Sequence, residues 1–238
     1  MIPYHRAEVH GLERIPAGPG LYVGNHSAGS LSIDTIIFAT AVLRHRGLKD
    51  LPWALAHDLL VDLPVWNQLL VPLGAVRARP EHASALLERG QKILVYPGGE
   101  LDALRPFCER NRIKFGTRRG YIRTALRHAV PIIPLITAGA HETFLVIDDL
   151  PWLAQLLGVD ERLRIKSWPL VLSLPWGLTL GPPPPHLPLP TKIRIEVLEP
   201  ITFSPSGEQA AEDAPYVAAC AERVEHTMQQ ALDRLSER

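Results

Sequence analysis

The stretch Leu21-Tyr22-Val23-Gly24-Asn25-His26 joins a short apolar run to a histidine, and Asp34 follows at the start of a second apolar run, 35–43. The first run predicts a buried strand, and the second predicts a helix with Asp34 as its N-cap. A histidine takes up a proton near neutral pH, and a carboxylate fixes its tautomer and stabilises its charged form. His26 and Asp34 are therefore candidates for a general base and its partner, although a structural histidine and a plain helix cap explain the pair equally well.

Outward from this stretch, strands and helices alternate along the chain. The predicted strands are 21–24, 53–56, 74–76, 92–96, 132–136 and 192–198, and the predicted helices are 34–46, 80–89, 117–128 and 214–235. The segment 63–70 is apolar and ambiguous. This alternation predicts an α/β fold, a single domain over 1–238 with a mainly parallel or mixed central sheet and helices on both faces. Sites in such sheets gather where the strands end.

The segment 150–190 interrupts this rhythm and is predicted as an insertion rich in tryptophan and proline. Its apolar run 168–180 contains two prolines and a glycine and is a poor helix. The proline run 182–185 suggests a stiff, extended connector. A closing strand and an amphipathic C-terminal helix are expected over 191–238.

Composition narrows the class of protein. Lys+Arg and Asp+Glu balance at 25 each, which argues against a nucleic-acid partner. The two cysteines are far apart and lack metal-binding spacing, so a reduced, cytoplasmic setting is expected. The N-terminus does not read as a signal peptide, and no run reaches the roughly 18–20 apolar residues of a membrane-spanning helix.

A second motif, Tyr96-Pro97-Gly98-Gly99-Glu100, follows the predicted strand 92–96. Glycines at this position let backbone amides approach a ligand, where they hold a developing oxyanion or a polar head group. Taken alone, the motif is better explained as an ordinary Pro-Gly turn.

Four blocks, taken in order, resemble the glycerolipid acyltransferase superfamily, which includes the lysophospholipid acyltransferases. They are Asn25-His26-Ser27 with Asp34, Leu73-Gly74-Ala75-Val76-Arg77, Tyr96-Pro97-Gly98-Gly99, and Val130-Pro131-Ile132-Ile133-Pro134. In that family the first block is catalytic, the second ends in a basic residue, and the third reads FPEGT or FPGG. The resemblance covers a motif-bearing core, 20–142, and a closing strand near 189–201. It implies a glycerol-3-phosphate acyltransferase-like fold.

The departures from the common family pattern are similar to its monoacylglycerol and diacylglycerol acyltransferase branch. Asp34 lies eight positions after His26 instead of five, and Gly98 replaces the usual glutamate. Asp102 occupies the acidic position of the GGxxE form, and Leu101 replaces a frequent arginine. Arginine suits bidentate phosphate binding, so its absence favours an acceptor without a phosphate.

The resemblance implies an O-acyltransferase that moves a fatty acyl group from acyl-CoA or acyl carrier protein to a hydroxyl of a glycerolipid or related acceptor. His26 would be the general base and Asp34 its partner, with no covalent intermediate, metal or bound cofactor. The expected substrate-binding residues are Asn25, Ser27, Arg77, Tyr96, Pro97, Gly98, Gly99 and Glu142. Contact with the cytoplasmic face of a membrane is expected through Trp152, Leu153, Leu156, Leu157 and 168–180, because tryptophan favours the bilayer interface. An ordinary core or a lid over an acyl channel explains these residues equally well.

Three other functions remain open at this stage. Asn25-His26-Ser27-Ala28-Gly29 approaches the GxSxG elbow of serine hydrolases and esterases, but Asn25 replaces the first glycine. Scattered histidines, notably His57 beside Asp58 and His141 beside Glu142, leave a metal hydrolase as a weaker alternative. A non-catalytic lipid-binding protein would use the same residues without turnover.

Overall fold

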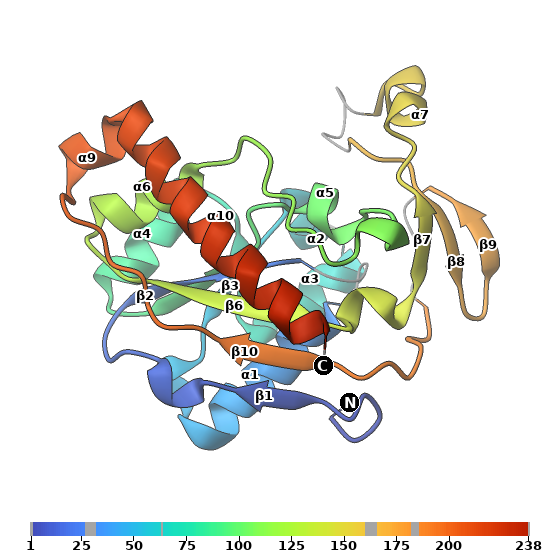
Figure 1. Cartoon of the computed structure of the whole chain (residues 1–238), viewed down its shortest axis with the longest axis horizontal. Helices are drawn as coiled ribbons and strands as arrows, with labels where there is room; N and C mark the ends of the chain where they lie inside the picture. Colours follow the sequence, from blue (N-terminus) through green and yellow to red (C-terminus); the bar gives the residue numbers. More distant parts are fainter. Residues whose placement is uncertain (1, 27–31, 63, 160–165, 182–185, 238) are drawn as a thin grey trace.

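A computed structural model of the protein describes residues 2–26, 32–62, 64–159, 166–181 and 186–237. Its main sheet is formed by β1 (Glu8–His10), β2 (Gly20–Gly24), β3 (Trp53–Ala56), β4 (Ala75–Arg77), β5 (Lys92–Val95), β6 (Ile132–Ala138) and β10 (Arg194–Val197). The strand order is β1-β10-β6-β2-β5-β3-β4, and Figure 1 shows β1, β10 and β6 side by side at one end of it. Ser27 and the proline run 182–185 lie outside the described residues.

The centre of this sheet is parallel. β2 pairs in parallel with β5 and β6, and β3 pairs in parallel with β4 and β5, whereas β10 runs antiparallel to β6. Parallel neighbours require crossovers, and helices supply most of them. The carboxyl ends of β2, β3, β4, β5 and β6 consequently share one edge, which we call the carboxyl edge.

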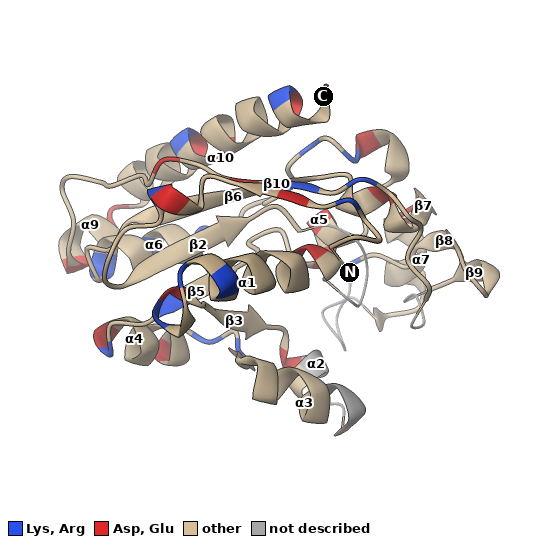
Figure 2. Cartoon of the chain, turned by 90° about the horizontal axis from the view of Figure 1, so that it is seen from below, with Lys and Arg blue, Asp and Glu red and all other residues tan. Residues whose placement is uncertain are grey.

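Helices cover both faces of the sheet, as the side view in Figure 2 shows for α1 and α10. The described α-helices are α1 (Ile33–His45), α2 (Asp58–Asp62), α3 (Pro64–Leu70), α4 (Pro80–Glu88), α5 (Glu100–Ala103), α6 (Gly120–Arg127), α7 (Pro151–Leu156), α9 (Glu208–Glu212) and α10 (Ala214–Ser236). Strand β2 is buried on both faces: Leu21 and Val23 join the core under α4, α6 and α10, and Tyr22 joins the core under α1. This two-sided burial explains its unbroken apolar run.

The long helix α10 follows the predicted pattern. Val217, Cys220, Val224, Met228, Ala231 and Leu235 are all buried at helical spacing. Asp213 caps the helix, because its side chain accepts a hydrogen bond of 3.0 Å from the Tyr216 amide.

A buried ion pair holds the opposite edge of the sheet, where the strands begin. Lys92, the first residue of β5, donates to the Asp50 carboxylate (2.8 Å) and to the Gly18 carbonyl (2.6 Å). Arg46 donates to the second Asp50 oxygen at 3.0 Å. Burial works to raise the pKa of Asp50, but the two cations outweigh it and the pKa is lowered.

The N-cap prediction for Asp34 is wrong. Helix α1 begins at Ile33 with Ser32 at the cap position, so Asp34 already lies inside the first turn. The Asp34 carboxylate accepts a hydrogen bond of 2.9 Å from the Thr35 amide and is almost fully buried. From the second helical position, the carboxylate satisfies one free amide of the first turn without occupying the cap position.

A second, antiparallel sheet was not anticipated from the sequence. It is formed by β7 (Leu145–Asp148), β8 (Leu170–Ser173) and β9 (Gly177–Leu180). The run 168–180, judged a poor helix, forms the β8–β9 hairpin. In Figure 1 this small sheet and α7 project from the body beyond the end of β6, and we call them the lobe.

None of the helices in the described part of the chain combines the length and the apolar character needed to cross a membrane. Cys108 is exposed, Cys220 is buried, and both are free thiols.

Candidate active site

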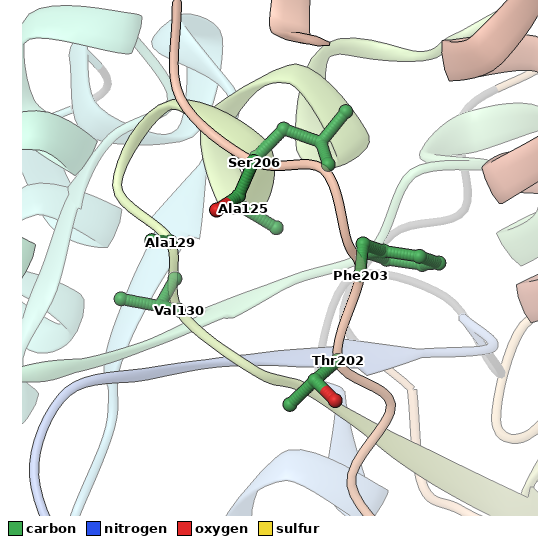
Figure 3. Close-up of a pocket in the computed structure, with 7 residues that line it drawn as sticks. Ala125, Ala129, Val130, Thr202, Phe203 and Ser206 are labelled. Atoms are coloured by element: carbon green, nitrogen blue, oxygen red, sulfur yellow. The ribbon is translucent and has the colours of Figure 1, made fainter.

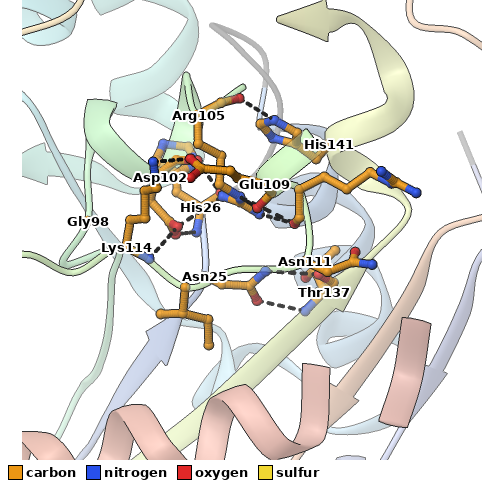
Figure 4. Close-up of polar contacts among 12 residues, drawn as sticks. Asn25, His26, Gly98, Asp102, Arg105, Glu109, Asn111, Lys114, Thr137 and His141 are labelled. Atoms are coloured by element: carbon orange, nitrogen blue, oxygen red, sulfur yellow. Dashed lines mark hydrogen bonds and ion pairs between the residues drawn. The ribbon is translucent and has the colours of Figure 1, made fainter. Parts of the chain in front are cut away.

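Asn25 fixes the end of β2 at the carboxyl edge. Its amide nitrogen donates to the Thr137 carbonyl on β6 (2.9 Å), and its amide oxygen accepts from the Thr137 amide (2.8 Å), as Figure 4 shows. The side chain is fully buried. The predicted contact of Asn25 with substrate stays a prediction; in this structure both ends of its amide hold the strand that delivers His26.

The main chain of His26 is held from both sides by buried charged groups. Its amide donates to the Asp102 carboxylate at 2.5 Å, and its carbonyl accepts from the Arg105 guanidinium at 2.8 Å. Asp102 and Arg105 form an ion pair at 2.9 Å, and both side chains are almost completely buried (Figure 4). The main chain of His26 is therefore positioned by Asp102 and Arg105, which lie 76 and 79 residues later in the chain.

The Arg105 side chain uses its donors on several backbone carbonyls as well as on Asp102. Its Nη2 donates to Arg110 at 2.7 Å, and its Nε contacts the carbonyls of Glu109 and Arg110, each at 3.2 Å. Burial raises the pKa of the Asp102 carboxyl, opposed by Arg105 and by the amides of Lys114 and His26. A group so enclosed acts as a fixed support for its neighbours.

Gly98 makes this support possible. A Cβ at position 98 would lie 2.3 Å from the Asp102 Cβ and 2.5 Å from the Lys114 carbonyl oxygen. The first glycine of the Pro-Gly-Gly turn thus leaves room for the carboxylate that holds His26. Asp102 occupies an acidic position of the family pattern, whereas Arg105 belongs to none of the sequence motifs.

The imidazole of His26 stacks on Tyr96, with ring centroids 4.5 Å apart and planes at 22°. The Tyr96 hydroxyl hydrogen-bonds the Thr35 hydroxyl at 2.6 Å, which joins the end of β5 to the first turn of α1. Burial raises the pKa of Tyr96 well above its ordinary value, and the nearby charge of Asp34 adds to the shift. His26, Tyr96 and Asp34 therefore belong to one cluster, and a direct His26–Asp34 hydrogen bond stays a prediction.

The Pro-Gly-Gly turn is braced from outside by Arg118. Its guanidinium donates to the Gly98 carbonyl (2.9 Å) and to the Glu100 carboxylate (2.8 Å). Gly99 adopts φ +51°, and its amide already donates to the Tyr96 carbonyl at 3.0 Å. The amide of Gly98 has no acceptor within the described residues.

His141 completes the support behind the site. Its Nε2 donates to the Arg105 carbonyl at 2.8 Å, and the ring is almost fully buried. Burial lowers the pKa of His141 to about 3, with the Arg105 charge acting in the same direction, so the ring is neutral at pH 7. His141 is thus a neutral donor in a structural role.

The other two predicted substrate residues lie further out and are already ion-paired. Arg77 ends the edge strand β4, roughly 14 Å from β2 across three strand spacings, and it contacts Asp62 at 2.5 Å. Glu142, in the 3₁₀ helix η5 (Ala140–Thr143), pairs with Arg110 at 3.3 Å. Their role in binding substrate stays a prediction.

No group of three His, Cys, Asp or Glu side chains able to hold a metal ion occurs among the described residues. The small pocket in Figure 3, about 30 Å³, is lined by Ala125, Leu126, Ala129, Val130, Thr202, Phe203 and Ser206. It holds about one water molecule and lies where β6 begins, opposite the edge that carries His26.

Comparison with known proteins agrees with this geometry. The family model described as Acyltransferase matches residues 6–138, more than half of the chain. An uncharacterized protein of Mycobacterium tuberculosis is 33% identical over 234 residues, which is 98% of this chain and 62% of that protein. The present chain therefore spans less than two thirds of that relative.

A bovine protein described as a DGAT1/2-independent enzyme synthesizing storage lipids is 30% identical over 198 residues, covering 82% of this chain and 56% of that protein. Among solved structures, the 1-acyl-sn-glycerophosphate acyltransferase PlsC of Thermotoga maritima has a similar fold. Its TM-score is 0.56 at 16% identity, over 98% of this chain and 73% of that one.

Proposed function

Because the chain belongs to the acyltransferase family, we propose that it moves a fatty acyl group from a thioester donor, acyl-CoA or acyl carrier protein, to a hydroxyl of a glycerolipid-related acceptor. The observation that carries this proposal is the placement of His26 at the carboxyl edge, with its main chain held on both sides by Asp102 and Arg105. A base held this rigidly is preorganised for proton transfer.

In the proposed reaction, the His26 imidazole removes the proton of the acceptor hydroxyl while that oxygen attacks the thioester carbonyl carbon. The tetrahedral intermediate then collapses, the carbon–sulfur bond breaks, and the proton passes from the imidazolium to the leaving thiolate. The products are an ester and a free thiol. Asp34 would stabilise the imidazolium as a neighbouring carboxylate, and the reaction needs neither a serine nucleophile nor a bound cofactor.

The negative charge on the intermediate needs hydrogen-bond donors. Within the Pro-Gly-Gly turn, the Gly98 amide is the better candidate, since the Gly99 amide already donates to Tyr96. The glycine backbone lets an acyl carbonyl come close. Tyr96 and Pro97 would border the same position, and Ser27 would follow the base.

The acceptor is proposed to be neutral, such as a monoacylglycerol or diacylglycerol. Leu101 stands where a phosphate-binding arginine is frequent in the family, and Arg77 is already paired with Asp62. The likeness to an enzyme named for storage-lipid synthesis supports the same acceptor class. We place the enzyme in the cytoplasm, working at the cytoplasmic face of a membrane where such lipids reside.

An acceptor panel with palmitoyl-CoA tests the proposal. Monoacylglycerol, diacylglycerol, lysophosphatidate and lysophosphatidylcholine would be compared for wild type, His26→Ala and the control His128→Ala, whose ring contacts Ser84 near the opposite edge. We expect transfer to the neutral acceptors and a loss of about 100-fold or more in His26→Ala only.

Three outcomes would contradict the proposal. Transfer to lysophosphatidate alone would overturn the neutral acceptor. Fluorophosphonate labelling, with activity lost in Ser27→Ala, would indicate a serine hydrolase. Lipid binding by wild type and His26→Ala alike, without turnover of any donor, would indicate a binding protein.

A further inference from the structure

The lobe presents one face made of leucines. In its antiparallel pairing, Leu172 lies opposite both Leu145 and Leu178, and Leu170 lies opposite Leu180. Directly paired residues point to the same face of a sheet. The five leucines therefore share one side, which we call the leucine face.

Three of the five leucines on the leucine face are exposed, and Leu145 and Leu170 are half-buried. Leu178 is 61% exposed and Leu180 is 57% exposed, although the interior of a soluble protein is the usual place for such side chains. Trp176, in the β8–β9 turn, is 54% exposed, and Leu174 and Leu187 add to the same apolar surface around the hairpin. A contiguous apolar surface of this kind marks an interaction site.

Helix α7 extends this character within the lobe. Trp152 and Leu156, four residues apart on one helical face, are both more than half exposed. The segments 150–159 and 167–181 contain no Asp, Glu, Lys or Arg. Asp148, Asp149 and Lys166 border these segments. Leucine beside tryptophan within them suits the boundary between lipid head groups and acyl chains.

The opposite face of the small sheet is attached to the active-site framework. Phe144, Val146 and Val171 are completely buried and pack with Leu104, which directly precedes Arg105. The lobe also follows β6 directly through η5, so it emerges at the carboxyl edge (Figure 1). The leucine face is therefore the side of the small sheet that points away from Leu104.

We propose that the leucine face, with Trp176 and the exposed side of α7, docks on the interfacial region of a lipid bilayer. The choice of occupant rests on the proposed function, because a bilayer is where acyl acceptors of that class reside. The contact is apolar, so it should persist at salt concentrations that screen surface charges.

Vesicle flotation tests the contact without using enzyme activity. Wild type would be mixed with uncharged phosphatidylcholine vesicles at low salt and in 0.5 M NaCl. It would be compared with Leu178→Thr/Leu180→Thr, because threonine suits an exposed strand. The matched control is Leu48→Thr, which changes a leucine that is 75% exposed in the 3₁₀ helix η2 (Leu48–Asp50), before β3 begins. Thermal melting would verify that all three proteins fold.

We expect wild type and Leu48→Thr to float at both salt concentrations, and the fraction of the double variant that floats to fall at least fivefold. Bromine-labelled acyl chains should quench wild-type tryptophan fluorescence more than that of Trp176→Phe. Equal flotation of a folded double variant, or no flotation of wild type, would overturn the proposal. The proposal would also be overturned if wild type is a dimer, the double variant is a monomer, and both float equally. The leucine face would then bind a second copy of the chain. If flotation follows the prediction but no acceptor is acylated, only the proposed function fails.

Discussion

Two buried ion pairs lie at opposite edges of the same sheet. At the edge where the strands begin, Asp50 meets Lys92 and Arg46, which join β5 to the segment after α1. At the carboxyl edge, Asp102 meets Arg105, and both also hold the main chain of His26. The chemistry is the same, but only the second pair touches the candidate base. A buried ion pair thus mainly stabilises the fold when its other hydrogen bonds go to structural backbone groups. It preorganises the site when those hydrogen bonds go to the residue that carries the chemistry.

The largest expected effect is on stability at the first edge. Lys92→Met removes one partner from a buried carboxylate, which we expect to lower the free energy of unfolding by about 3–5 kcal/mol. Urea unfolding at pH 7 would measure it, with the exposed Lys49→Met as control. Activity of the folded fraction should not change. A loss equal to that of Lys49→Met would show that Arg46 alone satisfies Asp50.

A comparable effect on activity is expected at the second edge. In Asp102→Asn, an NH₂ group replaces one of the two carboxylate oxygens and cannot accept a hydrogen bond. The main-chain amide of either His26 or Lys114 then loses its acceptor, and we expect the His26 side chain to shift. We expect kcat to fall about 100-fold with little change in KM. Asp50→Asn is the matched control, and its kcat should stay within about twofold of wild type. Equal kcat losses in the two variants would contradict the distinction between the edges.

His141 provides a smaller, pH-dependent test. Its pKa is lowered to about 3 in the folded state, against about 6.5 unfolded, so the unfolded chain binds the extra proton between these values. Stability should therefore fall as the pH drops below 6.5, by about 2 kcal/mol between pH 7 and pH 5. His141→Gln keeps a donor for the Arg105 carbonyl but does not titrate. Its unfolding free energy should lose much less over that range, and an identical pH profile would refute the assignment.

The smallest effect on stability and activity is expected for Arg77, which belongs to neither of the two buried ion pairs. Its ion pair with Asp62 is partly exposed, so Arg77→Ala should leave the melting temperature nearly unchanged. If Arg77 contacts substrate as predicted, KM should rise several-fold while kcat is preserved. Arg79→Ala, on the neighbouring exposed pair with Asp58, is the control. Unchanged kinetics in Arg77→Ala would remove this residue from the substrate site.

Much of the main sheet was predictable because its central strands are continuous apolar runs. Strands β5 and β6 are buried on both faces, and this burial explains why apolar residues follow one another without alternation within 92–95 and 132–136. The β8–β9 hairpin of the lobe was missed because its two strands flank Leu174-Pro175, a pattern typical of a loop. Packing on Leu104, far away in sequence, makes these strands possible.

The site was predictable only in part. His26, Tyr96 and the glycines carry local signals, since each follows a strand in a recognisable pattern. Arg105 does not, because its importance comes from a contact with His26 that spans 79 residues. The contact of Asn25 with Thr137 carried no local signal either, because the two residues are 112 positions apart.

The 2.3 Å that would separate a Cβ at position 98 from the Asp102 side chain has an evolutionary consequence. A relative that gains a side chain at the first position of this turn must shift the neighbouring backbone, because the new Cβ meets the Cβ of residue 102 and the carbonyl oxygen of residue 114. Replacing Asp102 by another residue with a Cβ would not remove this conflict. We therefore expect the path of the turn and of the segment around residue 114 to change together among homologues that lack this glycine.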